Sequence, residues 1–198
     1  MKEQARSEKT RARILQAAAE GFAQHGYDST GVAEICRRAK VSKGAFYHHF
    51  SSKQALFLHL LNTWETGVEG GLRAASSTSA TVPQALISMA DTLRDVLHAG
   101  RGQLPVFLEF WSQAAHDTAV WQATLAPYRR YRDLFADLIQ RGVEEGSLRP
   151  VPAKAAAQML VGLALGLLVQ ALIDPEGEDW GAASKDSIQI LLGGLERK

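Results

Sequence analysis

Apolar residues recur every three or four positions along most of the chain, and this spacing limits the possible folds more than any other feature. Residues spaced in this way share one face of an α-helix, whereas a half-buried strand needs strict alternation. Ile14, Ala18 and Phe22 follow the helical spacing, and no run alternates apolar and polar residues over more than a few positions. The sequence therefore predicts an all-α fold of about nine helices, without a sheet.

The 198 residues are enough for one large or two small domains, and 46% apolar with 22% charged residues is typical of a soluble globular protein. A single cysteine, Cys36, excludes an internal disulfide. The charged N-terminus lacks the apolar core of a secretory signal. The apolar stretch from Met159 to Ile173 is shorter than the roughly 20 residues of a membrane span. We therefore expect a cytoplasmic protein.

Charge is distributed unevenly between the two ends of the chain. Residues 1–53 contain ten Lys or Arg against five Asp or Glu, a net charge of +5, and the remaining residues carry −4. A basic N-terminal segment followed by an acidic remainder is typical of a protein whose N-terminal part binds a polyanion, although variation in composition alone can also produce this distribution.

Residues 30–53 contain the pattern of a helix-turn-helix. Val32 and Ile35 give a first short helix a buried face, and Ser42 can cap the helix that follows the turn. On that second helix Phe46 and Phe50 are four residues apart and can both face the core. Its opposite side consists of small and polar residues: Lys43, Gly44, Ala45, Tyr47 and His48. Such a surface suits the DNA major groove.

A long helix is expected to connect this motif to the rest of the chain. Ser51-Ser52-Lys53-Gln54 has the pattern of a capping box, in which the Gln side chain reaches back to the N-cap amide. The helix should extend over residues 51–74, because Gly70-Gly71 and an Ala/Ser/Thr-rich run indicate a junction there. The predicted domains are residues 1–53, which bind DNA, and residues 75–198.

Two segments together resemble the DNA-binding domain of the TetR family of transcriptional regulators. They are RARILQAAAEGFAQHGYDSTGVAEI at residues 11–35 and VSKGAFYHHFSSK at residues 41–53. The resemblance implies that Lys43, Gly44 and Ala45 lie at base edges, next to the capping Ser42. It also implies that Tyr47 pairs with a phosphate and that His48 approaches the backbone or a base. Thr30 and Lys53 would contact phosphates at the two ends of the motif.

Two residues depart from the family pattern. Lys40 stands where the family usually has Gly, so a non-Gly residue must hold the turn, at a modest strain if its φ is positive. Cys36 stands where Ala is common and is expected to be buried rather than to act as a redox sensor.

His48 and His49 point about 100° apart on a helix, which argues against a metal pair. Arg37-Arg38 fit either a DNA-facing surface or a solvated helix flank. We predict neither a metal nor a cofactor.

The resemblance also implies a helical second domain that dimerises through its last two helices and contains a ligand pocket. The helix from Ala153 to Ile173 is apolar on nearly every side, so it needs cover all round. The predicted dimer interface consists of Gly162, Gly166, Val169, Ile188, Leu191, Leu192 and Leu195, which could alternatively be plain core. The predicted effector pocket consists of Phe107, Phe110, Trp111, Trp121, Tyr128 and Tyr131, with the same alternative. Pro127 should start or kink the helix that carries the last two.

The sequence thus predicts a sequence-specific DNA-binding regulator rather than an enzyme. Its partners would be a double-stranded operator, a second copy of the chain and a small apolar or aromatic effector. By the resemblance, the effector would tilt the helix from Ser51, spread the two recognition helices and release a repressor from DNA. The alternative is a DNA-binding module that a protein partner controls, without a small-molecule pocket.

Overall fold

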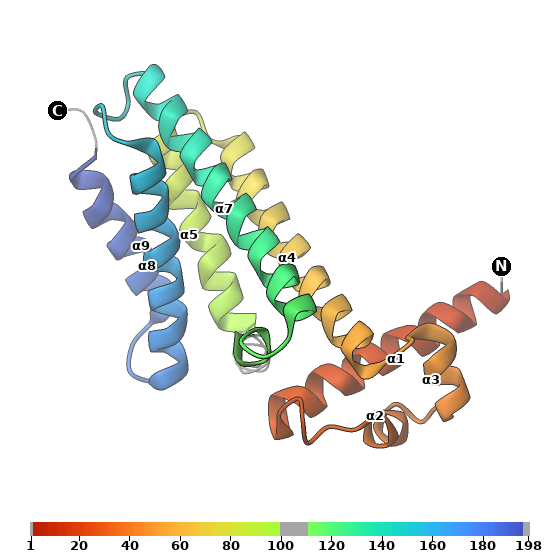
Figure 1. Ribbon diagram of the computed structural model, residues 1–198. Coiled ribbons are helices and arrows are strands. Elements are labelled where there is room, and N and C mark those ends of the chain that lie inside the picture. Colours follow the sequence, from red (N-terminus) through yellow and green to blue (C-terminus); the bar gives the residue numbers. More distant parts are fainter. Residues whose placement is uncertain (1, 100–110, 196–198) are drawn as a thin grey trace. The chain divides into compact units, whose positions relative to one another are not determined.

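The computed structural model describes residues 2–99 and 111–195, and in these residues it is helical without a strand (Figure 1). This confirms the all-α prediction. The helices are α1 (Lys2–His25), α2 (Val32–Ala39), α3 (Lys43–His49), α4 (Lys53–Thr78), α5 (Val82–Ala99), α7 (Thr118–Glu144), α8 (Ala153–Ile173) and α9 (Trp180–Gly193). Residues 111–114 are also helical and are followed by a turn before α7.

Contacts divide the chain into two compact units. Unit 1 comprises residues 1–64 and 102–124, and unit 2 comprises residues 65–101 and 125–198. Helices α4 and α7 therefore each contribute residues to both units.

The core of unit 1 is formed where α1, α2, α3 and the start of α4 meet. Ile14 and Phe22 of α1, Ile35 of α2, Phe46 of α3 and Phe57 of α4 are all at most 1% exposed. Phe22 packs edge-on against Phe57, with 5.4 Å between the ring centroids. These contacts fix α3, which has only seven residues and would not be stable alone.

The core of unit 2 is formed by α5, α7, α8, α9 and the later turns of α4. α9 packs along α5, and α8 packs against both (Figure 1). Val82, Ala85, Ile139 and Ala157 are fully buried there. α8 is long and apolar enough to cross a membrane, but its Leu160, Leu167 and Leu168 are buried in this protein core.

Two predicted helix starts differ from the structure. α4 begins at Lys53 with Ser52 as its N-cap, because the Ser52 hydroxyl accepts from the Ala55 amide at 3.0 Å. The predicted capping box is wrong, since the Gln54 amide donates to Asp117 at 2.6 Å instead. α7 begins at Thr118, so Pro127 does not start it and lies inside it, where the alternative prediction of a kink places it. Asp117 caps α7 by accepting from the amides of Ala119 and Val120.

Candidate DNA interface

The recognition helix α3 is fixed on one side and open on the other. Ser42 caps it by accepting from the Ala45 amide at 3.1 Å, as predicted. Phe46 is fully buried and Phe50 is 5% exposed, so this side faces the core of unit 1. The exposed residues on the other side are Ser42, Lys43, Gly44, Tyr47 and His48, with Ala45 half-buried between them. The chain thus presents the predicted contact residues together on one solvent-facing surface.

In the turn between α2 and α3, Lys40 adopts the left-handed conformation that glycine favours. This agrees with the expectation that Lys40 replaces the glycine usual in the family. Lys40 has φ 53° and ψ 49°, and no other non-Gly residue in the described part of the chain has a positive φ. The Lys40 and Val41 amides donate back to the carbonyls of Arg37 and Cys36. The Arg13 guanidinium donates to the carbonyls of Ala39 and Lys40 and so ties the turn to α1. This bracing compensates for the absence of glycine.

Cys36 lies inside the motif, 5% exposed, and its thiol donates to the Ser42 carbonyl at 3.9 Å. Burial raises the pKa of the Cys36 thiol, against a smaller opposing effect of Lys43. A buried thiol of this kind is unreactive, which agrees with a packing role rather than a redox one.

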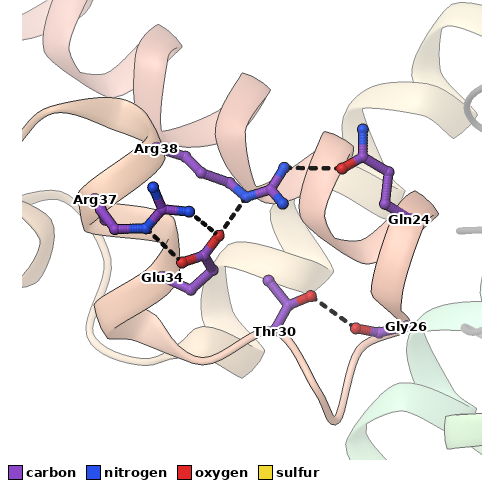
Figure 2. A network of polar contacts seen from close by, with 6 residues as sticks. All are labelled: Gln24, Gly26, Thr30, Glu34, Arg37 and Arg38. Carbon is purple, nitrogen blue, oxygen red and sulfur yellow. Dashed lines mark hydrogen bonds and ion pairs between the residues drawn. The ribbon is translucent and has the colours of Figure 1, made fainter.

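Thr30 is 1% exposed, and both of its donors are used inside the chain. Figure 2 shows the bond from its hydroxyl to Gly26. Its hydroxyl donates to the Gly26 carbonyl at 2.8 Å, and its amide donates to the Tyr27 carbonyl at 3.2 Å. Gly21 lies so close that a Cβ there would be 2.6 Å from the Thr30 methyl carbon. Thr30 therefore closes the turn before α2, and its predicted phosphate contact stays a prediction.

Arg37 and Arg38 share the carboxylate of Glu34 on α2 (Figure 2). Their hydrogen bonds lower the pKa of Glu34 to about 2, Arg37 acting most strongly. Arg38 also donates to Gln24 on α1, whereas the Arg37 side chain is 72% exposed. Arg38 is thus structural, and Arg37 lies where it can exchange Glu34 for another anion.

Lys53 is half-buried and bound within unit 1. Its ammonium donates to the Tyr27 carbonyl at 2.8 Å and lies 4.0 Å from the centre of the Tyr27 ring. A phosphate contact by Lys53, as the resemblance implies, would have to compete with this site.

Sequence reasoning assigned no role to several residues that position α3. Arg11 lies over the Phe50 ring at 5.1 Å and contacts the His59 imidazole at 2.9 Å, which joins α1 to α4. Burial and the nearby Arg11 charge both lower the pKa of His59. No local pattern marks this contact. The cap at Asp117, in contrast, could have been found, because Asp before a helix is a common N-cap.

The residues predicted for the pocket and the dimer fall in several places. Phe107 and Phe110 lie outside the described residues. Trp111 and Trp121 belong to unit 1 and are 38% and 49% exposed, whereas Tyr128 and Tyr131 belong to unit 2. Gly162 and Val169 on α8 are exposed and Gly166 is half-buried. Ile188, Leu192 and Leu195 are at most 9% exposed and pack in the core of unit 2, with Leu191 half-buried beside them.

Comparisons with known proteins agree with this arrangement of helices. Residues 14–60 match the family model described as bacterial regulatory proteins, tetR family. Residues 83–187 match the model described as BetI-type transcriptional repressor, C-terminal. The HTH-type transcriptional activator FasR of Mycolicibacterium smegmatis is 30% identical over 187 residues, 93% of this chain and 82% of that protein. The chain belongs to the TetR family of transcriptional regulators.

Other similar proteins match this TetR-family chain over nearly its whole length. The HTH-type transcriptional regulator UidR of Escherichia coli is 24% identical over 195 residues, 97% of this chain and 95% of that protein. A regulator from Saccharomonospora viridis in complex with choline has a TM-score of 0.84 at 21% identity, covering 96% and 100% of the two chains. FadR from Bacillus subtilis in complex with stearoyl-CoA has a TM-score of 0.83 at 19% identity, covering 93% and 99%. These two structures show that the fold is shared.

This member of the TetR family is thus a DNA-binding transcriptional regulator, and its family consists of regulators rather than enzymes. Within the described residues, no group of three or more His, Cys, Asp or Glu side chains could hold a metal ion.

Proposed function

We propose that this TetR-family protein is a homodimeric repressor that reads its operator with α3 and leaves it when a small organic effector binds. The observation that carries the DNA-binding part is the open side of α3, where small and polar residues are exposed on a helix whose other side is locked into a core. In this proposal Lys43, Gly44 and Ala45 reach base edges, and Tyr47 and His48 contact the backbone. Thr30 and Lys53 flank this surface.

Gly44 offers the sharpest test of this surface. A Cβ added at Gly44 would meet only the Ser42 hydroxyl, at an ordinary 3.8 Å, so Gly44→Ala leaves the free protein intact. If DNA approaches α3 here, the added methyl group should lower operator affinity by about tenfold or more. Gly67→Ala is the matched control, because Gly67 is an exposed glycine of α4 with open space around it.

The measurement starts from an operator that the wild-type protein selects from a random duplex library. Binding of this duplex is then titrated by fluorescence anisotropy with both variants and with Lys43→Ala. Lys43→Ala should reduce the slope of log affinity against log salt by about one if Lys43 neutralises one phosphate. Failure to enrich any sequence, or equal affinities for wild type and Gly44→Ala, would contradict the proposed reading surface.

Dimerisation through α8 and α9 is supported by the apolar side chains that these helices leave uncovered. Met159 and Ile173 of α8 are 57% and 78% exposed, and Ile190 of α9 is 79% exposed. Gly162 has open space in front of it, which would let a partner helix approach. Ile188 and Leu192 of α9, with Leu195 just after its end, would then support the interface from beneath. Val169, Gly166 and Leu191 would lie at its surface.

Gly162→Leu tests this interface. A Cβ at Gly162 meets nothing within 4 Å in the free chain, so the added side chain extends from an open surface where it would block a partner. We therefore expect the mass measured by sedimentation equilibrium to fall from dimer to monomer. Gly70→Leu, at an equally open glycine of α4, should leave the mass unchanged. A monomeric wild type, or a dimer that survives Gly162→Leu, would contradict this interface.

The effector part rests on the family and on the aromatic residues Phe107, Phe110, Trp111, Trp121, Tyr128 and Tyr131. Similar proteins bind choline in one case and stearoyl-CoA in another, so this fold accommodates organic ligands of different chemistry. The sign of regulation is proposed from the BetI-type repressor model, although the relative FasR is an activator. A protein that acts on an operator in this way works in the cytoplasm.

A further inference from the structure

Glu65 on α4 is a buried carboxylate and the first residue of unit 2. It is 6% exposed and is the only acidic residue among the buried residues that the structure describes. Its position explains the burial, because Leu61 and Leu72 lie four residues before it and seven after it and are buried on the same face. Burying an ionised carboxylate without a partner is costly, so such a residue needs an explanation.

The other two buried polar residues are satisfied, and Glu65 is not. The hydroxyls of Thr30 and Ser184 donate to backbone carbonyls at 2.8 and 2.6 Å. In the described part of the chain, no donor forms a hydrogen bond or ion pair with the Glu65 carboxylate; only its backbone carbonyl accepts, from the Tyr131 hydroxyl at 3.2 Å. Among the described residues, every side-chain nitrogen or oxygen atom that is completely shielded from solvent has a hydrogen-bond partner. Because the Glu65 carboxylate oxygens have no partner, they must keep a small solvent-accessible surface. The carboxylate is thus unpaired without being completely sealed from solvent.

The described cation whose charge acts on Glu65 is already engaged elsewhere. Arg130 on α7 contacts Glu69 at 3.2 Å, and Glu69, one turn after Glu65, also holds Arg73 at 2.9 Å. These contacts lower the pKa of Glu69, with Arg73 contributing most. Among the described residues, the titratable groups near Glu65 are Arg130 and Tyr131 of α7 and Glu69 of its own helix. Burial nevertheless raises the pKa of Glu65 to about 8, and Arg130 offsets this only in part.

We propose that the Glu65 carboxylate, beside Tyr131, is the recognition group for an organic cation, an amine or quaternary ammonium ion with an apolar or aromatic body. This proposal rests on the effector-controlled function above and specifies the chemistry of the effector. A cation in this place supplies the missing counter-charge, and the apolar surroundings strengthen the attraction because they exclude water. The Tyr131 ring, anchored through its hydroxyl, adds a surface that attracts cations.

Binding of a quaternary ammonium ion at neutral pH is coupled to the loss of a proton. Glu65 is protonated in the empty protein below about pH 8 and must ionise to pair with the cation, so one proton passes to the buffer. The affinity should therefore rise about tenfold for each pH unit between about pH 5.5 and 7.5 and level off above pH 8. A ligand held only by apolar contacts shows neither effect.

Two probes of nearly equal shape separate charge from size. Phenyltrimethylammonium carries a positive charge, and tert-butylbenzene is its neutral isostere. Titration calorimetry of the full-length protein, in two buffers of different ionisation enthalpy, gives the affinity and the number of protons released. We expect the wild type to bind the cation at least tenfold more tightly than the isostere at pH 8 and to release about one proton per chain at pH 6.5.

The test variant is Glu65→Gln, which has the shape of the protonated acid and so is expected to fold. It should lose the preference for the cation and the proton release, and keep whatever affinity the wild type has for tert-butylbenzene. Asp137→Asn removes one negative charge from an exposed position of α7 and should behave as the wild type. Absence of cation binding by the wild type, equal binding of the two probes, or an unchanged cation affinity in Glu65→Gln would overturn the Glu65 site.

Operator binding, measured separately, distinguishes this proposal from the proposed function. If the cation binds through Glu65 but leaves the affinity for the selected operator unchanged, the cation site stands and effector-controlled repression fails. If the protein binds the operator but not the cation, the Glu65 site fails and the DNA-binding function stands.

Discussion

The burial of Glu65 predicts a specific dependence of stability on pH, which Glu65→Gln should abolish. The folded protein holds a proton on Glu65 up to about pH 8, whereas the unfolded chain releases it above about pH 4.5. Because Glu65 binds more protons in the folded state between these values, its contribution to the free energy of unfolding falls as pH rises through this window. Above the window this contribution is constant. A shift from 4.5 to about 8 corresponds to a loss of about 5 kcal/mol by pH 9.

Gln cannot ionise, so the variant escapes this loss. Relative to the wild type, Glu65→Gln should be similar in stability near pH 5 and more stable by about 4–5 kcal/mol at pH 9. Urea unfolding followed by circular dichroism at several pH values between 5 and 9 measures the difference. The protomer concentration must be constant, because a dimer gains stability with concentration.

Asp137→Asn serves as the control for a general change in net charge. Asp137 is exposed, so this variant should follow the pH dependence of the wild type. Parallel curves for wild type and Glu65→Gln over the whole range would refute the reasoning, since they would mean that Glu65 ionises in the folded protein as easily as in the unfolded chain.

Three further predictions concern unit 1 and can be checked by the midpoint of urea unfolding. Lys40→Gly should stabilise the protein by about 0.5–1 kcal/mol, because Lys40 occupies the left-handed region at φ 53°; a loss would mean that its side chain contributes more than the strain costs. Asp117→Ala should cost about 1–2 kcal/mol, because it uncaps α7 and frees Gln54, whereas Gln54→Ala should cost about half as much. Gly21→Ala should cost about 1–3 kcal/mol, because its methyl group would collide with Thr30; a neutral effect would mean that this turn yields easily.

The helix-turn-helix could be predicted from the sequence because its determinants are local. The Ser42 cap and the spacing of Phe46 and Phe50 each depend on residues fewer than five positions apart. The turn at Lys40 could also be located locally, although Arg13 of α1 braces it from 27 positions away. The predicted capping box failed for the opposite reason. Gln54 bonds Asp117, which is 63 residues away, and a local pattern contains no information about such a competitor.

In unit 2 the helical spacing identified which residues are buried but not what covers them. Ile188 and Leu192 form the expected stripe on α9, yet they pack inside the chain, and the exposed apolar residue is Ile190. A stripe looks the same whether its cover is another helix of the same chain or a partner. Glu65 could have been noticed, because a carboxylate four residues after Leu61 interrupts an otherwise apolar face.

The positive charge of the N-terminal segment overstates its capacity to bind phosphate. Half of its ten Lys and Arg residues have acceptors within unit 1: Arg11, Arg13, Arg37, Arg38 and Lys53. A cation that must first leave an internal partner gains less from a phosphate, because the lost contact offsets the new one. Much of the basic charge therefore fixes the position of α3, and the exposed surface from Ser42 to His48 depends more on the close approach that Gly44 permits than on the number of charges beside it.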